Sequence, residues 1–113
     1  MEMIVHLHPE IFSLVGEGIK DVEVRVNDEK RRKLKIGDTL LFVNRDNEEE
    51  TIRVEVMDLL YYPSFEAVAE AFPMERLYKA GVSVEDYLAL MNSFYSEEEV
   101  KKYGIVAIKF RMD

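Results

Sequence analysis

Apolar and polar residues alternate along four segments of the chain, namely residues 3–8, 20–27, 51–58 and 105–112. Alternation with a period of two is typical of β-strands that bury one face. A fifth apolar segment, residues 39–43, follows a turn sequence and is also predicted to be a strand. The polar residues 44–50 indicate a hairpin connection to the next strand. The chain is therefore expected to form a β-sheet whose strands come mostly from its first half.

The apolar spacing becomes helical between Ser64 and Gly104. Ser64, Ser83 and Ser96 each stand before a helical apolar pattern, where a serine side chain can cap free amide groups. Ser96 and Glu99 have the spacing of a capping box, and Gly104 is suited to end the last helix. This region predicts an insertion of helices before the final strand.

Two shorter helical segments are predicted nearer the N-terminus. Pro9 suits the first turn of a helix that ends at Gly16 or Gly18, and Asp28 can begin a helical turn that runs to Leu34. With that brief turn omitted, the order of elements is β-α-β-β-β-α-α-α-β. This order predicts an α+β domain built on a small β-barrel with flanking helices. In a closed barrel, the first and last strands would lie near each other.

The balance of charge limits the kind of partner that the protein can have. The 113 residues, predicted to form a single domain over 1–113, carry 15 basic and 23 acidic side chains, for a formal net charge of −8. A protein that coats nucleic acid non-specifically would instead be basic. Residues 20–35 differ from the rest, because they contain seven basic and four acidic residues. This local excess favours a confined anion site whose binding depends weakly on salt.

The residue types also bear on metals, cofactors and membranes. The chain has no cysteine, which excludes disulfides and thiolate zinc ligands. His6 and His8 share one face of the first strand, but no motif places a third ligand beside them, so neither a metal site nor a cofactor is predicted. No apolar run approaches the roughly 18 residues that span a bilayer, and no signal-peptide pattern is present. We therefore expect no membrane partner and a cytoplasmic location.

The second predicted strand carries the sequence GIKDVEVR at residues 18–25. Its valines are expected to face the core, whereas Glu23 and Arg25 project together from the opposite face. Taken alone, these two residues are explained as a solvated ion pair on an exposed strand face. Lys20, at the entrance of the strand, is equally well explained as a solvated lysine.

This segment resembles GxKxxExR, the signature of the ASCH domain family, whose members have a PUA-like β-barrel. The resemblance extends over most of the chain, from His6 to Phe110. It includes a stretch similar to DxKR at Asp28, Lys30 and Arg31, a GD turn at Gly37 and Asp38, and the pairs Tyr95-Ser96 and Tyr103-Gly104. The chain thus resembles a small prokaryotic-type, single-domain member, which implies a PUA-like α+β fold.

The resemblance implies a role in RNA binding or RNA modification, in a cleft beside the barrel where the lysine, glutamate and arginine of the motif collect. The expected partner is RNA or a nucleotide-like small molecule, with Glu23 accepting a hydrogen bond from a base edge or a ribose hydroxyl. The residues expected to bind it are Lys20, Glu23, Arg25, Lys30 and Arg31.

Two other functions stay open at the level of sequence. One branch of similar proteins hydrolyses the amide of acetylcytidine with a threonine nucleophile assisted by the motif lysine, and Glu23 stands at the position that resembles this threonine. Because a carboxylate cannot replace the hydroxyl without a different intermediate, Lys20 and Glu23 are instead candidate acid and base residues of an amidohydrolase or ribonuclease.

Alternatively, the helical segment from Ser64 to Phe94 presents apolar residues to a protein partner. The aromatic residues of that segment are otherwise explained as core.

Overall fold

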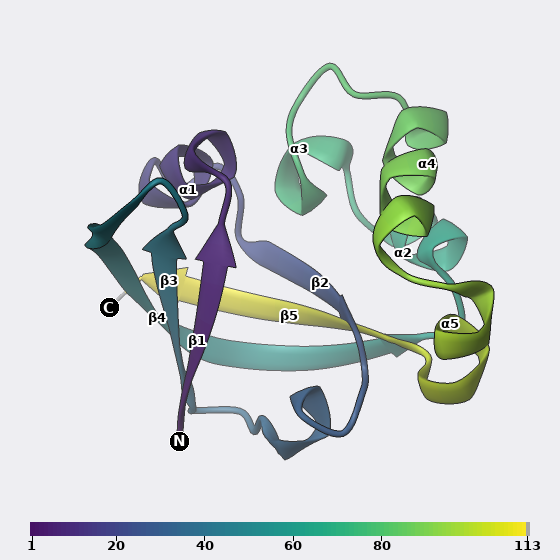
Figure 1. Ribbon diagram of the computed structural model, residues 1–113, viewed down its shortest axis with the longest axis horizontal. Helices are drawn as coiled ribbons and strands as arrows, with labels where there is room; N and C mark the ends of the chain where they lie inside the picture. Colours follow the sequence, from purple (N-terminus) through teal and green to yellow (C-terminus); the bar gives the residue numbers. More distant parts are fainter. Residues whose placement is uncertain (113) are drawn as a thin grey trace.

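The computed structural model describes residues 1–112, which form five β-strands, five α-helices and one short 3-10 helix (Figure 1). The strands are β1 (Glu2–Leu7), β2 (Val22–Val26), β3 (Thr39–Asn44), β4 (Asn47–Tyr62) and β5 (Ile105–Met112). The helices are α1 (Pro9–Gly16), η1 (Arg31–Lys33), α2 (Phe65–Ala71), α3 (Met74–Leu77), α4 (Val84–Phe94) and α5 (Glu97–Tyr103). The predicted α+β class and the helical insertion before the last strand are confirmed.

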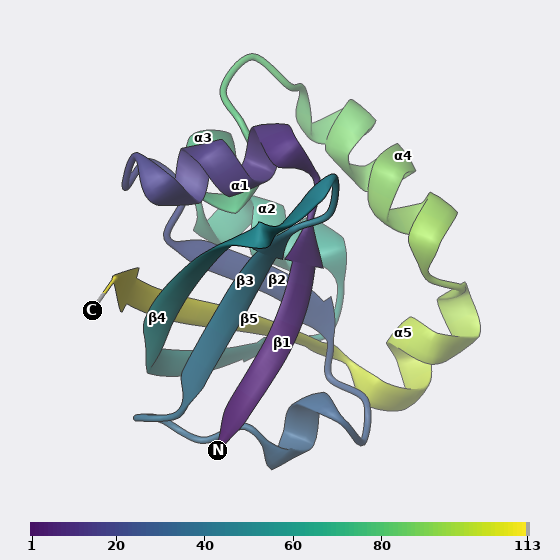
Figure 2. The same ribbon diagram turned by 60° about the vertical axis from the view of Figure 1, so that its left-hand side comes forward.

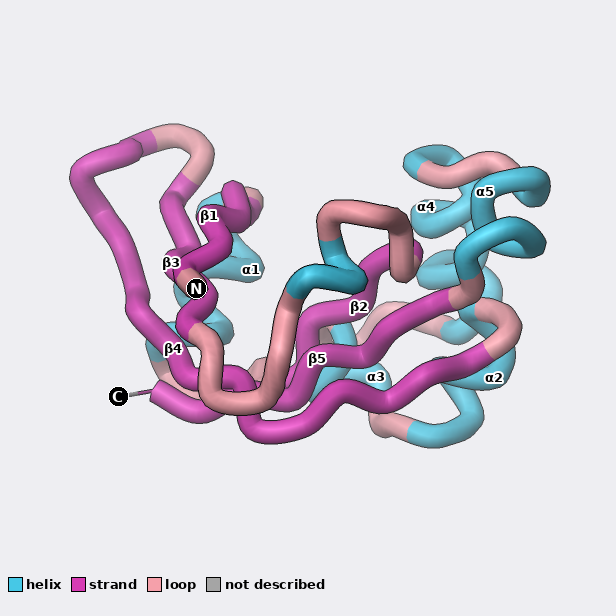
Figure 3. The backbone as a smooth tube through the Cα atoms, turned by 90° about the horizontal axis from the view of Figure 1, so that it is seen from below, coloured by secondary structure: helices cyan, strands magenta, loops and turns pink. Residues whose placement is uncertain are grey.

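The five strands form one sheet in the order β1-β3-β4-β5-β2, and the sheet curls into a half-barrel (Figure 3). β1 and β3 are parallel, and the other neighbours are antiparallel. The first and last strands, β1 and β5, are not neighbours in the sheet, because β5 pairs with β4 on one side and with β2 on the other, but both contribute side chains to the same hydrophobic core. The two edges of the half-barrel are therefore β1 and β2.

Strand β4 is 16 residues long and forms the bend of the sheet. It pairs with β3 over its first part and with β5 over its second part, and its register shifts between Val56 and Asp58. Such a bulge bends a strand and increases its twist. The predicted strand, residues 51–58, is too short at both ends, because Asn47 already pairs with Asn44 of β3 and residues 59–62 continue the ladder with β5.

Two hydrophobic cores lie on opposite faces of β5, and α1 and α4 lie on opposite sides of β2 (Figures 1 and 2). The first fills the inside of the curled sheet and is covered by α1. The second joins the outer face of β2 and β5 to helices α2, α3 and α4, and the valines of β2 belong to it. Residues 105–108 are at most 2% exposed because one core takes Val106 and Ile108 while the other takes Ile105 and Ala107.

Three of the four helices of the insertion, α2, α4 and α5, begin at the predicted serine caps, whereas α3 follows Pro73. Ser64, Ser83 and Ser96 accept hydrogen bonds from backbone amides at 3.2, 3.1 and 3.1 Å, and Ser96 forms the predicted capping box with Glu99. These caps satisfy amide groups that the first turn of a helix leaves free. Over residues 1–112, none of the helices combines the length and the apolar character that crossing a membrane requires.

Candidate functional site

Strand β2 places the two polar residues of the motif on the inner side of the half-barrel. Glu23 is paired with Ile108 of β5, and Arg25 is paired with Val106, so both share a face with side chains of the first core. The alternative explanation, a solvated ion pair on an exposed strand face, does not hold, because Glu23 is only 6% exposed. The opposite face of β2 is also buried, since its valines pack against the helical insertion. An edge strand with two buried faces thus carries the candidate site.

Lys20 lies just before β2 and is 2% exposed. Its Nζ donates a hydrogen bond to the carbonyl oxygen of Val22 and another, at 2.6 Å, to that of Leu77, the last residue of α3. The same Nζ lies 3.4 Å from Oε1 of Glu23. An ammonium group has three protons to donate, and these three acceptors are enough to use them. Lys20 therefore ties β2 to the end of α3 and places its amino group next to the carboxylate of Glu23.

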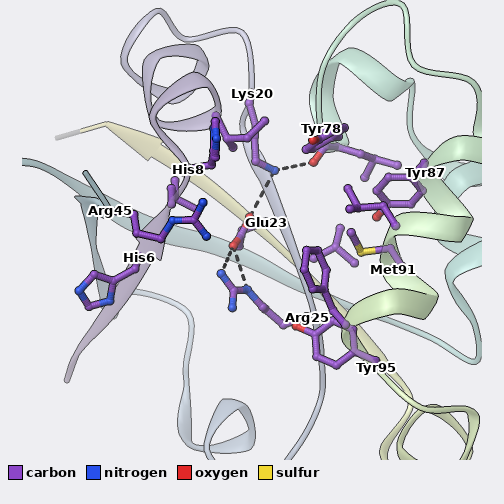
Figure 4. A pocket seen from close by; sticks show the side chains of 16 residues that line it. His6, His8, Lys20, Glu23, Arg25, Arg45, Tyr78, Tyr87, Met91 and Tyr95 are labelled. Carbon is purple, nitrogen blue, oxygen red and sulfur yellow. Dashed lines mark hydrogen bonds and ion pairs between the residues drawn. The ribbon is translucent and has the colours of Figure 1, made fainter. Parts of the chain in front are cut away.

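Glu23 and Arg25 form a second close pair within the same cluster. Oε2 of Glu23 accepts hydrogen bonds from Nε of Arg25 at 2.9 Å and from Nη2 at 2.7 Å. The side chain of Arg25 is 23% exposed, so its guanidinium reaches from the buried carboxylate toward the solvent. One buried carboxylate is thus held between two cations (Figure 4).

These contacts shift the acidities of the cluster. Burial lowers the pKa of Lys20, although the adjacent Glu23 carboxylate opposes this change. Burial by itself would raise the pKa of Glu23, but the charges and hydrogen bonds of Arg25 and Lys20 outweigh it and hold that pKa below its usual value. Glu23 in turn raises the pKa of Arg25. Glu23 is therefore an ionised hydrogen-bond acceptor at neutral pH and a weak base.

The cluster lies in a cleft of about 550 Å³ between the two edges of the half-barrel and helix α4. Pockets of this size accommodate small organic ligands and cofactors. His6, His8 and Arg45 line the cleft on the side of β1, as Figure 4 shows. The apolar and aromatic wall on the other side consists of Tyr78, Tyr87, Leu90, Met91, Phe94 and Tyr95.

The structure brings together three of the five residues expected to bind the ligand. Lys20, Glu23 and Arg25 converge in the cleft, whereas Lys30 and Arg31 do not line it. Lys30 lies instead in a separate shallow depression near η1 that it shares with Tyr103. The predicted helical turn after Asp28 is present, with the Asp28 carboxylate accepting a hydrogen bond from the Arg31 amide at 3.0 Å.

Several cleft residues have no motif in the sequence. Arg45 belongs to the short turn between β3 and β4. The sequence of this turn predicts a polar connection but does not indicate that Arg45 lines the cleft. The aromatic residues of α4 were explained as core, and Tyr87 does pack in the second core while it also lines the cleft. The spacing of His6 and His8 indicates that their side chains share one face of the chain, but it does not indicate that this face lines a cleft.

The two histidines make separate local contacts. His8 caps α1, because its Nδ1 accepts a hydrogen bond from the amide of Glu10 at 3.3 Å. Nε2 of His6 lies 3.6 Å from Oε1 of Glu48, across the edge of the sheet. Among residues 1–112, no group of three or more histidine, aspartate or glutamate side chains is arranged to hold a metal ion.

The fold and the cleft define a class of small α+β domains in which a curled half-barrel carries a polar site between its edges. The family model for the ASCH domain matches residues 5–112, and the chain belongs to the ASCH domain family. ASCH domains are generally thought to bind RNA. No protein with a curated description matches the chain.

Solved structures share this fold. The crystal structure of hypothetical protein PH0355 is 33% identical, covers 100% of both chains and has a TM-score of 0.87. The solution NMR structure of protein PF0455 from Pyrococcus furiosus is 33% identical, covers 99% of this chain and 97% of its own, and has a TM-score of 0.79. An S128A mutant of ZmASCH from Zymomonas mobilis, at 15% identity, covers 97% of this chain and 67% of its own with a TM-score of 0.61. This last likeness shows the fold alone.

Proposed function

We propose that the cleft between β1, β2 and α4 binds RNA or a nucleotide-like ligand. The observation that carries the proposal is that the buried residues Lys20 and Glu23 and the half-buried Arg25 meet at one side of a cavity. Removing charged groups from water costs free energy that their mutual attraction only partly returns. Clusters of this kind with shifted pKa values, when they line a cleft, are candidates for functional sites.

The cations available to a ligand are Arg25 and Arg45. Arg25 uses Nε and Nη2 on Glu23, which leaves Nη1 to point elsewhere, and Arg45 is exposed and reaches the cleft from the opposite side (Figure 4). A guanidinium group matches the geometry of phosphate oxygens. Two arginines facing one cavity are suited to hold a single phosphate group or two neighbouring ones.

The wall formed by α4 provides a surface for a planar ring. Tyr87, Met91 and Tyr95 lie along this wall (Figure 4), and bases that leave their stack commonly pack on aromatic side chains. A phosphate near the arginines would place an attached base against this wall. The cleft therefore has the parts needed for one nucleotide rather than for a long duplex.

Binding measurements test this proposal directly. We expect short single-stranded RNAs or nucleoside 5′-monophosphates to bind, and Arg45→Ala to weaken the binding about 5- to 10-fold through loss of one charge-assisted hydrogen bond. Calorimetric titration of the two proteins gives both dissociation constants. Arg45 makes no side-chain hydrogen bond or ion pair within residues 1–112, so the variant should keep its fold.

Arg111→Ala is the matched control, because Arg111 is 65% exposed and lies outside the cleft. It should bind as the wild type does. If neither RNA nor any mononucleotide binds, or if both arginine variants bind equally well, the cleft is not the binding site.

Catalysis is a second candidate function, and the lowered pKa of buried Lys20 beside Glu23 favours it. Against an acyl-enzyme route, no serine, threonine or cysteine lines the cleft within the described residues 1–112. Incubation with acylated cytidines and with RNA would reveal hydrolysis. A product formed by the wild type and lost in Glu23→Gln would establish catalysis.

A further inference from the structure

Tyr87 combines deep burial with an unused polar group. The residue is 1% exposed, and its hydroxyl is shielded from solvent without a hydrogen-bond partner among residues 1–112. Tyr87 also lines the cleft, where its hydroxyl is on the side of Glu23 (Figure 4). Most buried hydroxyl groups find a partner, because leaving one unpaired costs about 1–3 kcal/mol.

The hydroxyl of Tyr87 is a hydrogen-bond donor at all ordinary pH values. Burial raises the pKa of Tyr87, and the negative charge of Glu23 raises it further. The phenol therefore stays protonated. Among the side chains of its neighbours on α4 along the cleft, Leu90, Met91 and Phe94, the sole acceptor is the weak thioether sulfur of Met91.

Glu23 retains an unused acceptor position on the same side of the cleft. A carboxylate has about four lone-pair positions. Oε2 accepts both hydrogen bonds from Arg25, and Oε1 faces Nζ of Lys20 at 3.4 Å. One position on Oε1 is left, so the cleft contains a free donor on Tyr87 and a free acceptor on Glu23.

We propose that Tyr87 Oη and Glu23 Oε1 together recognise an uncharged polar edge in which an N–H group stands beside a hydrogen-bond acceptor, as on a nucleobase. Tyr87 donates to the acceptor of the ligand, and Glu23 accepts from its N–H group. The arginines then hold the anionic part of the same ligand. This inference rests on the proposed function, because it assigns the uncharged part of the ligand to the same cleft.

Two kinds of probe separate recognition of the edge from recognition of the phosphate. The four nucleoside 5′-monophosphates carry both groups, whereas ribose 5-phosphate has the phosphate without the base. We expect at least one nucleotide to bind the wild type 10-fold or more tightly than ribose 5-phosphate. Tyr87→Phe should weaken binding of that nucleotide about 3- to 10-fold, the loss expected for one neutral hydrogen bond, and leave binding of ribose 5-phosphate unchanged.

Tyr62→Phe is the control for removing a tyrosine hydroxyl, because Tyr62 packs against the second core outside the cleft. It should not alter binding. A second readout needs no ligand: since Tyr87→Phe removes an unpaired buried group, its Tm should equal or exceed that of the wild type. A Tm several degrees lower would mean that the hydroxyl is bonded within the fold, and would overturn the inference.

The outcomes also distinguish this inference from the proposed function. Nucleotide binding that Arg45→Ala weakens and Tyr87→Phe leaves unchanged would overturn the inference alone. Equal affinity of the wild type for nucleotides and ribose 5-phosphate would do the same. If none of these probes binds the wild type, the proposed function fails and the inference fails with it.

Discussion

Lys20 is held by protein atoms on every side. Its ammonium group contacts two backbone carbonyls and the carboxylate of Glu23, and its side chain has almost no exposure. Because these acceptors use its three protons, we infer that Lys20 acts on a ligand through Glu23 rather than by direct contact. Direct contact then falls to Arg25, Arg45 and Tyr87, which have free donors.

Replacing Lys20 by methionine should destabilise the protein by about 3–5 kcal/mol, the usual cost of removing one partner of a buried ion pair. The substitution leaves the carbonyl of Leu77 without its donor and Glu23 with Arg25 alone. The free energy of unfolding, measured with a chemical denaturant, checks this value.

Lys79→Met provides the comparison, since Lys79 forms an ion pair with Glu10 at 3.1 Å on the surface. Solvent screens such pairs, so this variant should remain close to the wild type. A Lys20→Met variant as stable as Lys79→Met would contradict the structural role of Lys20.

The junction between α5 and β5 fixes the position of β5, the strand that pairs with the site strand β2. Gly104 has a φ of 71°, its amide donates to Val100 at 2.8 Å, and its carbonyl accepts from Asn27 at 2.9 Å. β5 starts at the next residue and holds β2 through antiparallel pairing. The conformation of one glycine thus sets where the strand that carries Glu23 and Arg25 can lie.

Gly104→Ala should destabilise the protein by about 1–2 kcal/mol, because residues with a Cβ pay this cost for a positive φ. A Cβ at this position would also lie 3.4 Å from the carbonyl oxygen of Tyr62. Thermal unfolding followed by circular dichroism measures the loss.

Gly16→Ala serves as the matched substitution. Gly16 ends α1 without a positive φ, and its Cβ would meet only the end of the Ile52 side chain at 3.4 Å. Alanine is favoured over glycine in such a position by up to about 1 kcal/mol. The two variants should therefore change stability in opposite directions, and a common direction would contradict this explanation.

At the scale of the whole molecule, an acidic protein presents a small basic site. The net charge of −8 repels a polyanion, while Arg25 and Arg45 place positive charge at the cleft. The predicted basic cluster is divided by the fold, because Lys30 and Arg31 lie outside the cleft. Long-range attraction should therefore contribute little to binding.

The affinity for a short RNA should fall slowly as salt rises. Contacts to single-stranded phosphates contribute a slope of about −0.7 each in a plot of log K against log salt concentration. With two arginines, we expect a slope of about −1 to −2, and Arg45→Ala should reduce its magnitude by about 0.7. Titrations at several salt concentrations measure the slope. A slope of about −4 or steeper would indicate a broad surface site instead.

Much of the fold could be predicted because it depends on local patterns. The alternating valines of β2, the three serine caps and the glycine before β5 each act within a few residues. The length of β4 could not be predicted, because the strand extends to Asn47 only through pairing with β3 and to Tyr62 only through pairing with β5. The sheet remains open as a half-barrel, and this too could not be predicted, since pairing partners are distant in sequence.

The sequence by itself determined that Glu23 and Arg25 share a face of one strand, because side chains two residues apart point the same way. Only the tertiary structure decided that this face is buried, since the second core turns the valines toward the helices and leaves Glu23 facing the inside of the half-barrel. It also brought Arg45 and Tyr87 to the cleft and kept Lys30 and Arg31 away. Burial and proximity depend on segments far apart in the chain, and the alternation within one strand contains no information about them.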